Sequence, residues 1–135
     1  MADSDSRKWG PVLVTGATGF TGSVLVRKLA EAGAELRALV RSSSDTARFS
    51  DLDIAWFQGG VADADTVEAA TRGVSYVFHM ATAYREGKTT AEDFERVHVT
   101  GTRRVAEAAA RSPALRRFVH VSTIGVHGHI DGPPA

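Results

Sequence analysis

The chain has 135 residues, 43% of them apolar, and its sixteen basic and sixteen acidic residues balance to a net charge of zero. This length fits one domain with a real core, and the balanced charge gives no reason to expect nucleic acid or an anionic membrane as a partner. Without cysteine there is no disulfide and no thiolate metal site. No apolar run reaches ~18 residues, and the polar N-terminus does not resemble a signal peptide. We therefore expect a soluble, cytoplasmic protein without a metal.

Strand-like and helical segments alternate along the chain after a flexible polar lead over residues 1–9. The predicted strands are Val12–Thr15, Glu35–Val40, Ile54–Gln58, Val74–His79 and Arg117–Ser122. The predicted helices are Gly22–Ala32, ended by Gly33; Asp65–Thr71, capped by Asp63; and a long helix from a capping box at Thr90–Asp93 to about Arg111. A short helical turn is expected over Asp45–Phe49.

This alternation predicts an α/β fold with a doubly wound parallel sheet. Right-handed crossovers favour the strand order 3-2-1-4-5. Ligands of such sheets bind beyond the carboxyl ends of the strands, between strands one and four. The residues that follow those strand ends are therefore the candidates for a site.

Three glycines at intervals of three, Gly16, Gly19 and Gly22, follow the first predicted strand. Glycine there permits positive φ and lets the backbone approach a phosphate without an intervening Cβ. Unpaired amides at the start of the next helix face the same point. No Gly-Lys-Ser/Thr closes the turn, which excludes a Walker-type loop. The pattern predicts a pyrophosphate-binding turn rather than a purely structural one. Its residues are Gly16, Ala17, Thr18, Gly19, Phe20, Thr21 and Gly22.

The second predicted strand runs into Arg41 and three serines instead of a carboxylate. Dinucleotide folds that prefer NAD place an acidic side chain there, on the adenosine ribose. A guanidinium pairs with a 2′-phosphate and stacks on adenine. We therefore expect NADP as the cofactor, with NAD as the alternative, and Arg41 and Ser42 as its ligands. The competing interpretation of Arg41 is a solvated surface residue.

The ends of the fourth and fifth predicted strands carry the other candidates. His79 ends a buried strand and is expected to be a hydrogen-bonded core residue rather than a base. Small residues after it would let the ribose and nicotinamide half of a cofactor lie against the backbone. Ser122 and Thr123 place two hydroxyls at a central strand end, where one of them is positioned to hydrogen-bond a substrate carbonyl or alcohol.

Four motifs recur in order along the chain: Thr15-Gly16-x-x-Gly19-x-x-Gly22, His79-x-Ala81-Thr82, Val99-x-Gly101-Thr102 and Val121-Ser122-Thr123-x-x-Val126-His127-Gly128. Together they resemble the extended short-chain dehydrogenase/reductases, the group named for NAD-dependent epimerases and dehydratases. The resemblance runs from about residue 10 to the last residue. It implies a Rossmann-type NAD(P)-binding domain over residues 10–135 whose glycine turn contacts the pyrophosphate. It further implies Val61 at the adenine, Met80, Ala81 and Thr82 on the ribose side, and Thr123 as the catalytic hydroxyl residue.

The chain departs from the family pattern at four points. An Asp expected at the adenine falls on Gly60, which leaves the backbone there to hold the base. An expected Asn is His98, and an expected Tyr is His127. The fourth point is the position of Tyr-x-x-x-Lys: this spacing occurs once, from Tyr84 to Lys88, before the fifth predicted strand, whereas the family pattern has it on the helix after that strand. A phenol of pKa near ~10 needs such a lysine for proton transfer at neutral pH.

We therefore expect the nucleotide-binding part of an oxidoreductase or epimerase that transfers hydride at a hydroxyl- or carbonyl-bearing carbon of a sugar nucleotide or small ketone. The sheet is expected to be truncated after strand five, without the C-terminal substrate-binding portion, and the chain to be inactive as it stands. A non-catalytic module that senses NADP or docks onto a partner is the alternative, with self-association into a homo-oligomer as one outcome. A scaffold without a ligand is the third interpretation.

Overall fold

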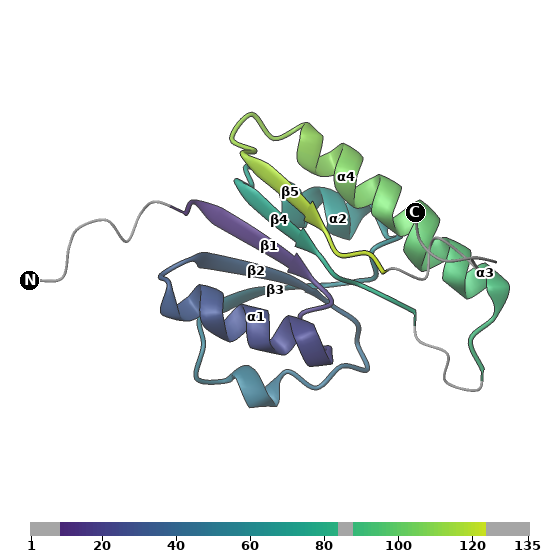
Figure 1. Cartoon of the computed structure of the whole chain (residues 1–135), viewed down its shortest axis with the longest axis horizontal. Helices are drawn as coiled ribbons and strands as arrows, with labels where there is room; N and C mark the ends of the chain where they lie inside the picture. Colours follow the sequence, from purple (N-terminus) through teal and green to yellow (C-terminus); the bar gives the residue numbers. More distant parts are fainter. Residues whose placement is uncertain (1–8, 84–87, 124–135) are drawn as a thin grey trace, which may run out of the picture.

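The computed structural model describes residues 9–83 and 88–123, and these contain one five-stranded sheet (Figure 1). Its strands are β1 (Pro11–Thr15), β2 (Glu35–Val40), β3 (Ile54–Gln58), β4 (Tyr76–His79) and β5 (Arg117–His120). All neighbouring strands pair in parallel, in the order β3-β2-β1-β4-β5. The predicted fold class and strand order are confirmed.

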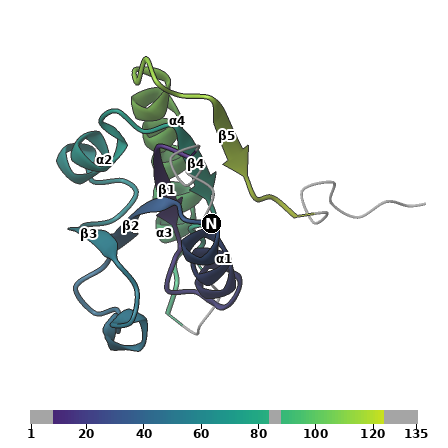
Figure 2. The same ribbon diagram turned by 90° about the vertical axis from the view of Figure 1, so that its left-hand side faces the viewer.

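Helices cover the sheet from both sides (Figures 1 and 2). The longer ones are α1 (Phe20–Glu31), α2 (Ala64–Thr71) and α4 (Thr102–Ala110), with a short α3 (Ala91–Phe94), a 3-10 turn η1 (Ala47–Phe49) and a π-helical segment η2 (Glu95–Gly101). Side chains of α1 pack on one face of the sheet, and those of α2 and α4 pack on the other. Within the described residues, no helix is both long and apolar enough to cross a membrane.

Alternation along β1 divides the core into two clusters. Val12 and Val14 face α1, where they meet Val26. Leu13 between them faces the other side and packs with Val105 of α4. All four side chains are buried, as expected for a central parallel strand that is covered on both faces. β1 therefore holds the centre of the sheet, and its carboxyl end leads directly into the glycine turn.

The predicted capping residues are found at the ends of the helices. Asp63 caps α2 by accepting from the amide of Thr66, and Thr90 and Asp93 form the predicted capping box. Gly33, at φ +77°, ends α1. Its amide and that of Ala34 return to the carbonyls of Ala30 and Leu29, the bonds of a Schellman motif. The boundaries themselves differ from prediction by up to two residues, most visibly at β4 and β5, which are shorter than expected.

The predicted long helix is continuous in the chain but not uniform in its winding. The segment η2 has π-helical winding between α3 and α4. Gly101 closes this segment next to Val61, and a Cβ on Gly101 would lie 2.4 Å from a Val61 methyl carbon. The wide turn thus lies close against the loop that follows β3. Sequence periodicity did not reveal this packing.

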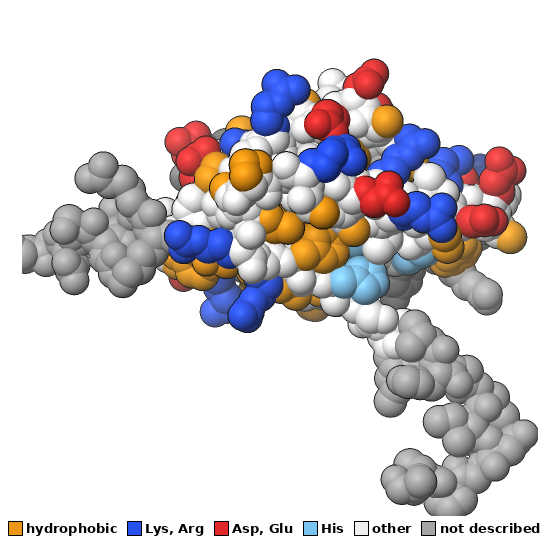
Figure 3. Space-filling view, turned by 90° about the horizontal axis from the view of Figure 1, so that it is seen from above, with side chains coloured by type: hydrophobic (Ala, Val, Ile, Leu, Met, Phe, Trp, Pro, Cys, Tyr) orange, Lys and Arg blue, Asp and Glu red, His pale blue; other side chains and the backbone are white. Residues whose placement is uncertain are grey.

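Among the described residues, β5 is an edge strand of the sheet. Its Phe118 and Val119 remain half-buried, and Val121 just beyond it is 49% exposed. Figure 3 shows hydrophobic and histidine side chains gathered in the middle of one face, between charged residues at its sides. The open edge expected from the sequence is therefore present in the described part of the chain.

Candidate functional site

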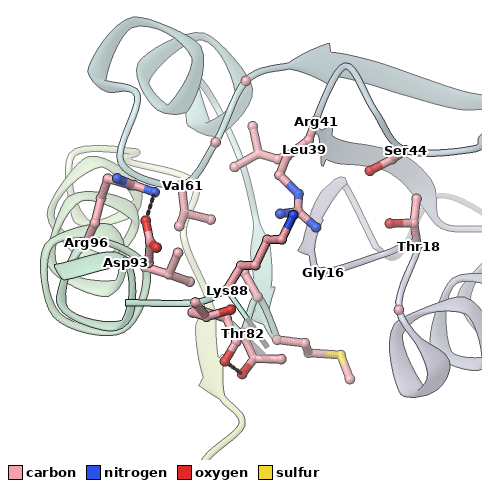
Figure 4. A pocket seen from close by; sticks show the side chains of 18 residues that line it. Gly16, Thr18, Leu39, Arg41, Ser44, Val61, Thr82, Lys88, Asp93 and Arg96 are labelled. Atoms are coloured by element: carbon pink, nitrogen blue, oxygen red, sulfur yellow. Dashed lines mark hydrogen bonds and ion pairs between the residues drawn. The ribbon is translucent and has the colours of Figure 1, made fainter. Parts of the chain in front are cut away.

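A cavity of about 660 Å³ lies at the carboxyl ends of β1, β2, β3 and β4. The glycine turn, the loops after β2, β3 and β4, and the start of the α3–η2 segment form its walls (Figure 4). Its lining residues are Gly16, Thr18, Gly19, Leu39, Arg41, Ser44, Gly59, Gly60, Val61, Met80, Ala81, Thr82, Ala83, Lys88, Thr89, Asp93, Arg96 and Val97. This is the crevice in which doubly wound sheets bind their ligands.

The glycine turn is packed too tightly for larger residues. Gly16 has φ +73°, and a Cβ there would lie 2.7 Å from the carbonyl of Met80. A Cβ on Gly22 would lie 1.9 Å from the carbonyl oxygen of Gly16. Glycine at both positions is therefore required by the close approach of α1 to the turn and of the turn to β4.

Helix α1 begins with its amides directed toward the turn. Gly19 is the N-cap and makes no side-chain cap, and no acidic residue occupies the first turn of the helix. The first amides of a helix have no intrahelical acceptor, and the helix dipole adds positive charge there. A diphosphate fits this end of the cavity, since its oxygens accept from such amides.

A buried hydrogen-bond chain links three elements below the cavity. The hydroxyl of Thr15 lies 2.8 Å from Nδ1 of His79, and Nε2 of His79 lies 2.9 Å from the hydroxyl of Thr102. The amides of Met80 and Ala81 each lie 3.1 Å from the same Thr15 oxygen. The chain fixes the backbone that lines the cavity after β4.

His79 is a neutral core residue, as the sequence predicts. It is 1% exposed, and burial lowers its pKa from 6.5 to about 4, with smaller contributions from the neighbouring histidines His120 and His98. Both ring nitrogens have hydroxyl partners. An imidazole bonded in this way holds structure and has no nitrogen left for a substrate.

The end of β2 supplies a cation and a hydroxyl to the cavity. Arg41 lines it, but the serine that does so is Ser44 rather than the predicted Ser42. The amide of Ser44 returns to the carbonyl of Arg41 at 3.0 Å, so the chain turns back and carries Ser42 away from the cavity. A second guanidinium, that of Arg48 in η1, donates to the carbonyl of Thr18 in the glycine turn.

The sequence patterns do not predict the wall opposite the glycine turn. It is made by Lys88, Asp93, Arg96 and Val97. Asp93 lies 2.6 Å from Arg96 and accepts from the amide and hydroxyl of Thr90, and the Thr90 bonds lower the pKa of this carboxyl more than the arginine does. The capping box predicted where this helix begins, but it did not predict which of its side chains line the cavity.

His98 supports the loop after β4 from the same helical segment. The amide of Ala83 donates to Nε2 of His98 at 3.2 Å, and the imidazole stacks on Phe94 with ring centroids 5.6 Å apart. The imidazole thus occupies the place at which the family pattern has an asparagine, and it binds backbone there.

Several predicted residues do not line the cavity. Gly22 and Ala17 are buried beneath the turn, whereas Phe20 is 93% exposed beside it. Thr21 and Ser42 are exposed. Thr123 is exposed beyond β5 and is likewise not a lining residue. The motif residues Val126, His127 and Gly128 lie outside the described part of the chain. Of the predicted cofactor residues, those that do line the cavity are Gly16, Thr18, Gly19, Arg41, Gly60, Val61, Met80, Ala81 and Thr82.

Comparisons with known proteins agree with this geometry. The chain is 36% identical over 115 residues to the ceramide reductase of Caulobacter vibrioides, an alignment that covers 85% of this chain and 35% of the relative. The crystal structure of gox2253 matches with a TM-score of 0.77 at 38% identity, over 92% of this chain and 38% of that one. A short-chain dehydrogenase/reductase superfamily protein from Agrobacterium tumefaciens with bound NAD matches with a TM-score of 0.73 at 29% identity, over 87% and 34%.

The chain spans only about a third, 33% to 35%, of the length of curated relatives that it matches. A family model described as NAD dependent epimerase/dehydratase family matches residues 12–134. With a parallel sheet ordered β3-β2-β1-β4-β5 and a glycine turn after β1, the chain belongs to the NAD dependent epimerase/dehydratase family.

Proposed function

We propose that this chain is the NADP(H)-binding Rossmann domain of an oxidoreductase or epimerase that acts at a hydroxyl- or carbonyl-bearing carbon. The observation that carries the preference for NADP is Arg41, which lines the cavity at the end of β2. An NAD-preferring site places a carboxylate there. In the part of the chain that the structure describes, the one carboxylate that lines the cavity is that of Asp93, which is bound by Thr90 and Arg96 on the opposite wall.

Different residues of the cavity bind different parts of such a cofactor. The turn from Gly16 to Gly22 and the first amides of α1 receive the pyrophosphate. Thr15 and His79 hold the Met80–Ala81 backbone as a fixed wall for the ribose side. When bound, the dinucleotide supplies a hydride acceptor or donor. Thr123 is proposed to hydrogen-bond the substrate oxygen.

Turnover by this chain alone is not expected. The Tyr-x-x-x-Lys spacing of this sequence, Tyr84 to Lys88, precedes β5. The family pattern has this pair after the fifth strand, and without it there we assign no residue to the proton that accompanies hydride transfer. The proposal therefore assigns cofactor binding to the 135 residues and leaves the choice of substrate open between a sugar nucleotide and a small ketone. Robust reduction of a carbonyl substrate by the purified chain would contradict it.

Fluorescence titration of the purified chain with NADPH and with NADH tests the proposed cofactor. We expect tighter binding of NADPH, and we expect Arg41→Asp to reverse the order, because a carboxylate repels the 2′-phosphate and accepts from the ribose hydroxyls. Arg103→Asp is the matched control, since Arg103 is exposed on α4 and does not line the cavity. Tighter binding of NADH by the unmodified chain would refute the assignment to NADP.

A non-catalytic, partner-docking module is the second candidate. The open β5 edge favours it, since half-buried Phe118 and Val119 and the exposed Val121 lie there. Sedimentation of the purified chain separates the possibilities: self-association is expected from this candidate, and a monomer that binds NADPH is expected from a simple cofactor domain.

A further inference from the structure

Lys88 contributes a charge to the cavity that has no assigned role. It lies between β4 and α3, on the wall opposite Arg41, and its side chain is exposed. Figure 4 shows the Lys88 side chain extending into the cavity with its amino group directed toward the guanidinium of Arg41. Two cationic side chains from distant parts of the sequence thus point toward one another across one cavity.

Among the described residues, the charges that line the cavity are not balanced. They comprise the cations Arg41, Lys88 and Arg96 and the single carboxylate Asp93. Asp93 is paired with Arg96 at 2.6 Å. Among the described residues, neither Arg41 nor Lys88 has a carboxylate partner. Like charges that face one another repel, and an anionic group placed between them turns that repulsion into two attractions.

The position of the pair selects the anion. The pyrophosphate of a dinucleotide belongs at the glycine turn and the α1 N-terminus. Arg41 lies instead at the end of β2, where the adenosine ribose is bound in this fold. The group that adds charge at that point is a 2′-phosphate, which carries about two negative charges at neutral pH.

We propose that Lys88 and Arg41 bind the 2′-phosphate of NADP(H) from opposite walls, which makes Lys88 a second determinant of cofactor specificity. This inference rests on the proposed function. Arg41 contributes planar, bidentate donors, and Lys88 contributes a point charge on a flexible stem. Arg41 and Lys88 are far apart in the sequence, and a single phosphate bound between them would contact both side chains.

The test compares NADPH and NADH binding to the full 135-residue chain and to its Lys88→Gln variant by nicotinamide fluorescence. A charge-assisted hydrogen bond to phosphate corresponds to about a tenfold change in affinity. We therefore expect Lys88→Gln to weaken NADPH about tenfold and to leave NADH within about twofold. Lys88→Arg should retain the preference, because it retains the charge.

Lys28→Gln is the control, since Lys28 is an exposed lysine of α1 outside the cavity. Calorimetry with 2′,5′-ADP and 5′-AMP gives a readout that is independent of the nicotinamide, and Lys88→Gln should weaken the first and spare the second. Equal weakening of NADPH and NADH would place Lys88 on the pyrophosphate and overturn the inference, as would no weakening of either.

Failure of this inference can be distinguished from failure of the proposed function. If Arg41→Gln lowers the NADPH preference while Lys88→Gln does not, the inference fails and the proposed function stands. If the unmodified chain prefers NADH or binds neither cofactor, both fail. In the double variant Arg41→Gln with Lys88→Gln, we expect NADPH and NADH to bind with similar affinity, because both cations assigned to the 2′-phosphate are then removed.

Discussion

The hydroxyl of Thr15 donates its proton to Nδ1 of His79, which lies 2.8 Å away. This direction follows from the other bonds of the same oxygen, which already accepts from the amides of Met80 and Ala81. A hydroxyl has one hydrogen, and it is left for the imidazole. His79 therefore carries its own hydrogen on Nε2, from which it donates to Thr102 at 2.9 Å.

Thr15→Val should destabilise the protein by about 2 kcal/mol, because it removes the hydroxyl partner of the Ala81 amide and of the buried His79 imidazole while it conserves shape. The amide of Met80 keeps its bond to the carbonyl of Thr15. Urea unfolding measures the loss. Thr15→Ser, which keeps the hydroxyl, should recover most of it. An unchanged midpoint for the valine variant would contradict the assigned chain of hydrogen bonds.

Stability should fall as the pH is lowered from about 6.5 to about 4, the unfolded and folded pKa values of His79. Over that window the unfolded chain takes up a proton that the folded chain resists, so folding loses free energy as the pH falls. At about 1.4 kcal/mol per unit, the contribution of His79 approaches about 3 kcal/mol at the acid end. His79→Asn should flatten this part of the profile, measured by urea unfolding at each pH. An equally steep profile in that variant would assign the effect to other groups.

Gly22→Ala should lower the stability of the protein, whereas Gly60→Ala should leave it nearly unchanged, although both glycines lie in predicted cofactor-binding segments. A Cβ at Gly22 would meet the Gly16 carbonyl oxygen at 1.9 Å, whereas one at Gly60 would meet nothing within 4 Å. We expect Gly22→Ala to cost about 3 kcal/mol or prevent folding, and Gly60→Ala to change stability by less than about 0.5 kcal/mol. Thermal unfolding of both variants checks this, and similar melting temperatures would contradict it.

Gly101→Ala should destabilise the protein by about 1 kcal/mol, despite the better helix propensity of alanine. The added methyl would lie 2.4 Å from a Val61 methyl carbon, so Val61 must move and the cavity wall with it. NADPH affinity should fall in parallel, as a titration would show. Val61→Ala, combined with Gly101→Ala, should restore part of the stability, because it removes the colliding methyl.

Local patterns in the sequence determined the framework of this protein. Apolar runs, caps and glycine stops predicted every strand to within two residues, and chirality rules then ordered the sheet. The spacing of Gly16, Gly19 and Gly22 predicted the turn, because a tight strand–turn–helix connection depends on neighbours in the chain. Arg41 was found in the same way, from its place directly after a strand.

Tertiary packing decided the rest of the site. Thr15 and His79 are 64 positions apart, and His79 and Thr102 are 23 apart, so no local pattern joins them. Lys88 does not come directly after a strand, so its place in the sequence did not mark it as a site residue. It reaches the cavity because the segment before α3 lies opposite β2. The π-helical winding of η2 likewise accompanies the contact between Gly101 and Val61. Such contacts form only when distant elements pack, because their energy comes from burial and hydrogen bonds between segments that the sequence keeps apart.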